Sequence, residues 1–274
     1  MAIELLIFAD TTGRWWRAAQ RLQSQARSIS LIDRVTLLDE SWLFREAPLA
    51  WMASSTFPKT RGFGYWRWKP LAIASTIAHS TSRFVLYLDA GCEFNITPAS
   101  QSRLQHYLQL TEDNSMLLMS QRTNLLEWCK AEAWLAFGQT STSVKAMPMV
   151  TASAMFLRSG EYNPVLARWL ESANTDNGHL FDDQLDPEIQ PPEFKDHRHD
   201  QAILSLVANE MGLPLLPDET YFEGEWGDAA SAYPIWTMRN RHRFTLHPGS
   251  VVGRLANRAR HLRNLATSSK NTLS

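Results

Sequence analysis

The sequence predicts a single α/β domain in which helices flank a mostly parallel central sheet. Apolar runs that suit strands alternate along the chain with stretches of helical spacing, which is typical of this class. One of the runs, residues 84–88, is apolar at every position, as in a strand that is covered on both faces. The chain has 274 residues, of which 44% are hydrophobic, and this is enough for one large domain.

The elements of the first half follow from apolar periodicity and from turn residues. Pro70 suits the first position of a helix, where its missing N–H costs nothing, and small and apolar residues follow it at helical spacing. Pro58 and two glycines predict a loop over 54–64. The expected elements are strands at 3–9, 32–38 and 84–88, and helices at 15–27, at 40–52 in part, and from Pro70 to residue 79.

The second half continues the alternation. Pro164 marks the start of one helix, and the small residues in the run 149–157 leave room for another group to approach the backbone. The polar, proline-bearing stretch 174–195 is a long loop, and such loops are usually functional or mobile. The expected elements are helices at 98–110, 125–137, 163–172 and from about 200 to 211, and strands at 115–120 and 149–157.

Cysteine content and hydropathy narrow the environment. Cys92 and Cys129 are the two cysteines, and they form neither a disulfide framework nor a metal-binding spacing, so we expect a reducing compartment. No signal peptide is evident after Met1, and no run of about 18 apolar residues predicts a spanning helix. We therefore expect a cytoplasmic protein.

Charge is unevenly distributed, although the net charge is −1. No acidic residue follows Asp228, and such basic blocks usually meet anionic partners. We expect the main domain to span 1–250 and a basic helix and tail to span 251–274. This helix either packs on the domain through its apolar face or docks on anionic lipid at the inner face of the membrane. We expect no nucleic-acid partner. The basic residues of the end are Arg239, Arg241, Arg243, Arg254, Arg258, Arg260, Arg263 and Lys270.

Two strand ends carry candidate ligand-binding residues. Asp89, Ala90 and Gly91 follow the apolar strand 84–88, and ligands of open α/β sheets bind beyond the carboxyl ends of strands. Asp10 and Thr11 follow the first strand, where they either face a ligand or cap the next helix.

An aromatic stretch with basic residues precedes Pro70. Arg61, Trp68 and Lys69 belong to it, and it suits either a packed aromatic corner or a platform for a sugar or base beside cationic phosphate contacts. The N–H groups at the helix start attract anions, so we expect Lys69 to contact phosphate.

The stretch from Asp196 to Gln201 allows three interpretations. Asp196 or Asp200 caps the helix that follows, His197 and His199 bind zinc, or Asp200 and Gln201 lie at the floor of a site. The first and third are compatible, because a capping aspartate can also face a ligand.

These motifs together resemble GT-A-type glycosyltransferases that use nucleotide-sugar donors. The sequence YLDAGCE around Asp89 is similar to their DxD region, Asp200-Gln201 to the Asp-Gln pair of retaining members, and LHPG around His247 to their late metal-binding histidine. GFGYW…WKP with YLDAG and HRHDQ is also similar to bacterial proteins associated with surface polysaccharides. The resemblance covers roughly residues 1–250.

The resemblance implies a GT-A-like (Rossmann-like) domain that moves a sugar, with retention, from a nucleotide-sugar donor to a glycan or lipid-linked acceptor. It implies a divalent cation, Mn²⁺ or Mg²⁺, held by Asp89, Glu93 and His247. Gly91 stands where the second acid of DxD is expected, and Asp89 and Glu93 would lie about 13 Å apart in an extended strand. The catalytic candidates are Asp200 and Gln201, and the donor-binding candidates are Asp10, Thr11, Arg61, Trp68, Lys69, Asp89, Ala90 and Gly91.

Two other classes of function remain open. A metal-dependent phosphohydrolase or nucleotidyltransferase would use Asp89, Glu93 and Asp200 as ligands. A non-catalytic domain would bind a glycan or a partner protein through a degenerate site.

Overall fold

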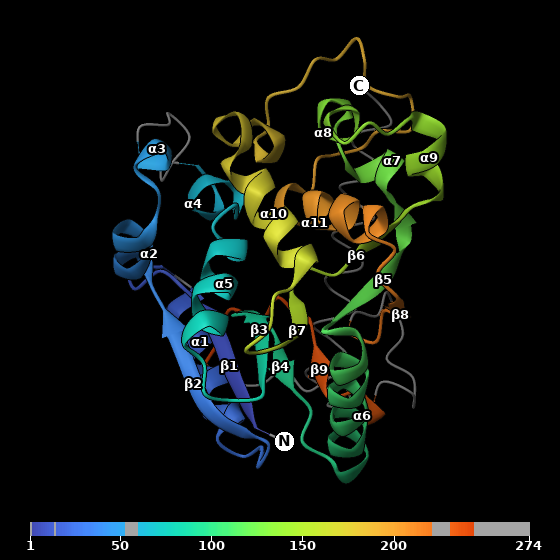
Figure 1. Ribbon diagram of the computed structural model, residues 1–274. Coiled ribbons are helices and arrows are strands. Elements are labelled where there is room, and N and C mark those ends of the chain that lie inside the picture. Colours follow the sequence, from blue (N-terminus) through green and yellow to red (C-terminus); the bar gives the residue numbers. More distant parts are fainter. Residues whose placement is uncertain (1, 14, 53–59, 221–230, 244–274) are drawn as a thin grey trace.

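A seven-stranded sheet forms the centre of the protein (Figure 1). The computed structural model describes residues 2–13, 15–52, 60–220 and 231–243. The strands lie in the order β2 (Ile32–Leu38), β1 (Ile3–Phe8), β3 (Phe84–Asp89), β7 (Ala154–Arg158), β5 (Met116–Asn124) and β6 (Pro148–Val150), and β8 (Leu215–Pro217) pairs with β5.

Most of these strands run in one direction. β1 is parallel to both β2 and β3, while β7 is antiparallel to β3 and to β5. β5 and its parallel partner β8 therefore share the direction of β1, and β6 and β7 run the other way. The predicted α/β class with a mostly parallel sheet is confirmed. In the register, Phe8 lies beside Asp89, so β1 and β3 end at the same edge.

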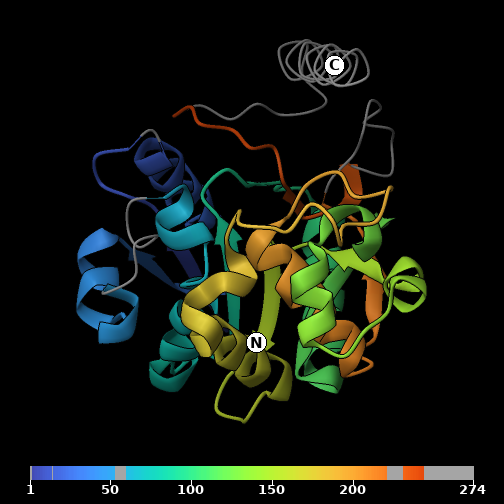
Figure 2. The same ribbon diagram turned by 90° about the horizontal axis from the view of Figure 1, so that it is seen from above.

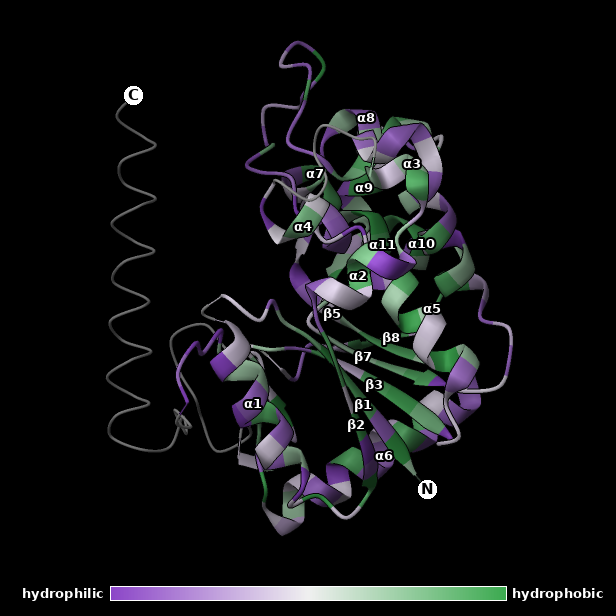
Figure 3. Cartoon of the chain, turned by 90° about the vertical axis from the view of Figure 1, so that its left-hand side faces the viewer, coloured by the Kyte–Doolittle hydropathy of each residue, from purple (hydrophilic) through white to green (hydrophobic). Residues whose placement is uncertain are grey.

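Helices cover both faces of the sheet (Figure 3). Leu6, Val85 and Tyr87 face one core, while Leu5 and Leu86 face the other, which explains why these strands are apolar throughout. One face carries α1 (Trp15–Ala26) and α6 (Pro98–Asn114), and the other carries α5 (Lys69–His79), α10 (Pro164–Asn174) and α11 (His199–Glu210). The last two helices lie side by side (Figure 2).

Side-chain caps fix the starts of several helices. Thr97 and Ser100 form a capping box at α6, and Asn163 accepts a hydrogen bond from Leu166 N at the start of α10. The shorter elements are α2 (Glu40–Glu46), α3 (Leu49–Met52), α4 (Gly62–Tyr65), α7 (Leu125–Trp128), α8 (Ala131–Ala136), α9 (Ser141–Ala146), the 3-10 helix η1 (Thr175–Phe181), and the strand pair β4 (Glu93–Phe94) and β9 (Ile235–Trp236).

Three predicted elements differ from the structure. The helix expected over 125–137 is divided into α7 and α8 at Cys129 and Lys130, which have extended backbone. The strand expected over 149–157 is interrupted between β6 and β7, and the long loop expected over 174–195 begins with η1. The predicted basic helix and tail over 251–274 and His247 lie outside the described residues. Among the described residues, no helix has the length and hydrophobicity needed to cross a membrane.

Candidate functional site

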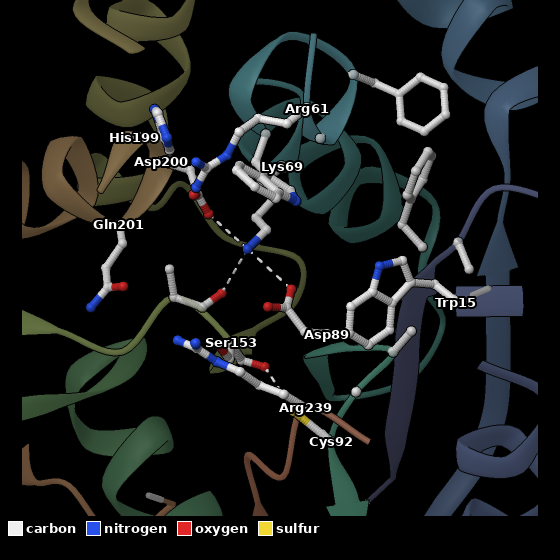
Figure 4. Close-up of a pocket in the computed structure, with 18 of the residues that line it drawn as sticks. Trp15, Arg61, Lys69, Asp89, Cys92, Ser153, His199, Asp200, Gln201 and Arg239 are labelled. Carbon is white, nitrogen blue, oxygen red and sulfur yellow. Dashed lines mark hydrogen bonds and ion pairs between the residues drawn. The ribbon is translucent and has the colours of Figure 1, made fainter. Parts of the chain in front are cut away.

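A pocket of about 730 Å³ opens at the carboxyl ends of β1 and β3 (Figure 4). Its walls come from the connection between β1 and α1, the start of α5, the loop after β3, the start of α11 and the segment after β9. Most of the predicted site residues meet here: Asp10, Arg61, Trp68, Lys69, Asp89, Ala90, Gly91, Asp200 and Gln201.

Lys69 lies at the centre of the pocket wall and joins two carboxylates. Its Nζ atom lies 3.0 Å from Asp89 Oδ1, 2.7 Å from Asp200 Oδ2 and 3.1 Å from the Ala152 carbonyl oxygen. The Ala152 carbonyl accepts a hydrogen bond from this ammonium group, and the two carboxylates form ion pairs with it. At the start of α5, Lys69 thus directs its charge to Asp89 and Asp200, and its contact with phosphate stays a prediction. Those two acids lie together, as expected from the sequence.

The ionisation of this group of three follows from burial and charge. Burial raises the pKa of Asp200 to about 6, although the ammonium of Lys69 opposes the shift. Burial acts to lower the pKa of Lys69, but the carboxylates of Asp200 and Asp89 outweigh it and the pKa is raised. Tyr87 donates a hydrogen bond of 2.7 Å to Asp89 Oδ1. The site thus places the carboxyl groups of Asp89 and Asp200 around one buried cation.

Asp200 and Gln201 lie in the first turn of α11, and the N-cap residue of this helix is Arg198. Asp200 is therefore not the N-cap, although a carboxylate in the first turn interacts favourably with the helix dipole. Gln201 Nε2 donates to Gln121 Oε1 at 2.8 Å, which orients its amide at the pocket wall.

The two histidines at the start of α11 contact backbone groups. His197 Nε2 donates to the Leu180 carbonyl at 2.9 Å, and its Nδ1 accepts from Lys130 N at 3.3 Å. His199 Nδ1 lies 2.8 Å from the Phe181 carbonyl oxygen. Burial lowers the pKa of both imidazoles. These contacts anchor the start of α11 to η1, so the zinc hypothesis is not supported.

Asp89 and Glu93, the two described residues expected to hold a divalent cation, do not face the same cavity. Glu93 is fully buried, accepts a hydrogen bond from Asn240 and does not line the pocket. At Gly91 a Cβ atom would lie 2.9 Å from Arg239 Cα and 3.0 Å from the ring of Trp15, so the position has no room for an acid. Over the described ranges, no group of three or more His, Cys, Asp or Glu side chains could hold a metal ion. These residues therefore do not fit the implied cation or the ligand set of a metal-dependent phosphohydrolase.

Two donor-binding candidates have other contacts. Thr11 does not line the pocket, because its N–H and hydroxyl bind the carboxylate of Glu40. Trp68 reaches the pocket but is 97% buried, with its ring centroid 4.0 Å from that of Phe8 and its Nε1 donating to the Gly62 carbonyl. Trp68 therefore belongs largely to the packed aromatic corner that the sequence also allowed.

Strained backbone conformations concentrate at the pocket. Among the described non-glycine residues, eight have positive φ, and Phe63, Trp66, His199 and Arg239 of these line the pocket. Each such residue costs about 1–3 kcal/mol and persists only where the surrounding structure holds it. This concentration favours a functional role for the cavity.

Sequence reasoning missed several residues of the pocket wall. Trp15, Arg198, Ser153 and Arg241 were not predicted to belong to the site, and neither was Arg239. The basic composition after Asp228 was the available signal for Arg239 and Arg241, because a basic segment can help to neutralise a leaving diphosphate.

No protein-family model and no curated protein matches the chain. Among solved structures, mouse xyloside xylosyltransferase 1 in its apo form has a TM-score of 0.47 at 11% identity, over 86% of this chain and 97% of that one. A glycosyltransferase involved in the glycosylation of the major capsid of PBCV-1 also scores 0.47 at 11% identity, over 88% and 95%.

The galactosyltransferase LgtC, in complex with donor and acceptor sugar analogs, scores 0.39 at 9% identity, over 97% of this chain and 95% of that one. These structural neighbours are glycosyltransferases. Similarity at this level describes the path of the backbone alone and carries no information about the reaction of this protein.

Proposed function

We propose that the protein transfers a sugar from a nucleotide-sugar donor to a glycan or lipid-linked acceptor. The observation that carries the proposal is the group formed by Lys69, Asp89 and Asp200 beside Gln201, in a pocket at the strand ends. Aromatic rings and arginines complete the walls of this pocket. A nucleotide-sugar donor combines a planar base, an anionic diphosphate and a sugar. Its binding site therefore needs aromatic rings, cations and acidic groups.

The proposed chemistry assigns separate roles to the acids and the cations. The bond between the anomeric carbon and the diphosphate breaks, and its electron pair goes to the diphosphate. The ionised carboxylate of Asp200 stabilises the positive charge that develops on the sugar. The acceptor oxygen forms the new bond, and its proton passes to the leaving diphosphate. Lys69 pairs with both Asp200 and Asp89 and holds them in place.

The finer features of the proposal rest on the motifs. The likeness of Asp200-Gln201 to the pair of retaining enzymes favours a hexosyl donor and retention of configuration. The likeness of the motifs around Trp66 and Asp89 to surface-polysaccharide proteins favours that pathway, at the inner side of a membrane. NMR of the anomeric proton in the product tests the stereochemistry.

Nucleotide binding and transfer test the proposal directly. UDP or GDP should raise the melting temperature, and the matching nucleotide-hexose should be turned over. Asp200→Asn should lower kcat by about 100-fold or more, because a neutral amide stabilises the charged sugar poorly. Asp176→Asn is the matched control, since Asp176 is exposed on η1 and Asn tolerates its left-handed backbone. No stabilisation by any nucleotide would refute the proposal.

A second function, nucleotide binding without transfer, is favoured by one observation. Lys69 forms ion pairs with both Asp89 and Asp200, so the charges of these acids are already compensated, as expected of a site that binds without catalysing a reaction. Stabilisation by a nucleotide without turnover of any donor, in the wild type as in Asp200→Asn, would identify this function.

A further inference from the structure

The segment that follows β9 crosses the loop after β3 and is fastened to it. Asn240 N donates to the Gly91 carbonyl at 3.0 Å. Figure 2 shows the segment, in red, running towards α1. Its two arginines, Arg239 and Arg241, have exposed side chains that line the pocket. The segment thus places charge at the loop that directly follows Asp89.

One buried side chain holds this arrangement together. Arg21 of α1 is 95% buried and donates through Nη2 to the carbonyls of Ala90 (3.3 Å) and Cys92 (2.7 Å). Through Nη1 it donates to the carbonyls of Asn240 (3.2 Å) and His242 (2.8 Å). The same guanidinium therefore binds both the loop after β3 and the arginine-bearing segment, which fixes their separation.

Gly91 makes the close approach of the two segments possible. A side chain there would meet the backbone of Arg239 on one side and the ring of Trp15 on the other. Trp15 in turn lies 4.9 Å below the guanidinium of Arg241. The resemblance implies a metal-binding acid at position 91. Gly91 instead has no side chain there, which leaves room for the backbone of Arg239.

The arginines around the pocket carry positive charge that its acids do not neutralise. Figure 4 shows Arg61 and Arg239 on opposite sides of the Lys69 ammonium. Burial lowers the pKa of Arg198; the charge of Asp196 opposes this shift, and the charges of Arg239 and Arg61 add to it, so the three arginines repel one another. The lining cations are Arg61, Lys69, Arg198, Arg239 and Arg241, against the acids Asp10, Asp89 and Asp200. A cavity with such an excess attracts a multiply charged anion.

We propose that Arg239 and Arg241 bind the diphosphate of the donor in the place that a divalent cation would take. The inference rests on the proposed function, whose leaving group is that diphosphate. Guanidinium groups bind phosphate oxygens in a bidentate manner and stay charged at all relevant pH values. Arg61 faces the same anion from the opposite wall, and Arg21 acts as a positioning residue.

Calorimetric titration with UDP, GDP and inorganic pyrophosphate, in EDTA and in Mn²⁺, tests the inference. At least one nucleotide should bind in EDTA with a Kd within about twofold of that in Mn²⁺, because no metal bridges it to the protein. Arg239→Gln and Arg241→Gln should each raise the Kd by about tenfold or more, the usual effect of losing a charge-assisted hydrogen bond. Arg243→Gln is the matched control: Arg243 belongs to the same segment and is exposed, but does not line the pocket. Its Kd should stay within about twofold.

The outcomes separate this inference from the proposed function. Nucleotide binding that requires Mn²⁺, or that is unchanged in both Arg239→Gln and Arg241→Gln, would overturn the arginine site and leave the glycosyltransferase proposal standing. Absence of nucleotide binding in both buffers would overturn both. The substituted side chains are exposed, and unchanged circular dichroism melting curves will verify that the variants fold.

Discussion

Lys69 is the residue on which the charge balance of the pocket depends, since its side chain is only 4% exposed and lies between Asp89 and Asp200. Lys69→Met keeps most of the volume and removes the charge. Removing one partner of a buried ion pair typically costs about 3–5 kcal/mol, because the other charge stays buried. We expect a loss of this size in the free energy of unfolding, measured by urea denaturation at pH 7.5.

An exposed ion pair provides the comparison. Lys145 lies 3.5 Å from Glu193, with side chains 64% and 47% exposed, and Lys145→Met should cost less than about 1 kcal/mol. Asp200→Asn, introduced into the Lys69→Met background, should restore part of the stability. Equal losses for Lys69→Met and Lys145→Met would contradict the account of the buried group.

Asp200 makes stability depend on pH. Its folded pKa of about 6 lies above its ordinary value of 3.8, so the folded state binds the proton more tightly. The stability that Asp200 contributes is therefore complete below pH 3.8 and is lost as pH rises through 6. Relative to Asp200→Asn, the wild type should lose about 3 kcal/mol of unfolding free energy over this range, and nothing more above pH 7. Urea denaturation at successive pH values measures it, and parallel curves for the two proteins would refute the shift.

At the scale of elements, the contact between the loop after β3 and the segment after β9 depends on Gly91. Gly91→Ala would place a methyl group 2.9 Å from Arg239 Cα, and backbone there cannot move as easily as a flexible side chain. We expect a loss of about 1–3 kcal/mol from overpacking, together with weaker UDP binding as Arg239 is displaced.

Gly160→Ala controls for the introduction of a methyl group. A Cβ at Gly160 meets nothing within 4 Å, and its φ of +77° leaves only backbone strain. This variant should lose some stability and no affinity for UDP. Unchanged affinity in Gly91→Ala would show that the contact does not position Arg239.

Elements governed by local periodicity were predictable, whereas those governed by distant contacts were not. The strands over 3–9 and 84–88 were predictable because their residues point alternately into the two apolar cores on opposite faces of the sheet. The helix expected over 125–137 is interrupted at Lys130, whose buried Nζ binds Asp182 Oδ1 (2.7 Å) and three carbonyl groups of residues 179–184. Nothing near Lys130 in the sequence indicates that partner.

The same distinction applies to the candidate site: residues with local signals were predictable, and contacts between distant segments were not. Asp89 and Lys69 were found because strand ends and helix starts are marked by local signals. That Lys69 joins Asp89 to Asp200 depends on how α5 and α11 meet, and the place of Arg239 depends on Arg21, which lies more than 200 residues earlier in the chain. A single sequence carries no direct sign of such pairings.

At the scale of the whole molecule, the total charge conceals an asymmetry. The net charge of −1 coexists with a pocket in which cations outnumber acids. Screening by salt shortens the range of this attraction to about 8 Å at physiological ionic strength. The pocket should therefore act on a phosphate mainly at close range.

The four hydrogen bonds of Arg21 also determine when the pocket becomes complete. Its bonds to Asn240 and His242 span 219 and 221 positions, so they cannot form until nearly all of the described chain exists. At a synthesis rate of roughly 5–20 residues per second, about 10–40 s separate the emergence of Arg21 from that of its last partner. During that interval a nascent chain can pair β1 with β2 and β3, yet it still lacks Arg239 and Arg241. The proposed arginine site is thus completed late in synthesis, and fragments that stop before Arg239 would have much of the sheet without that site.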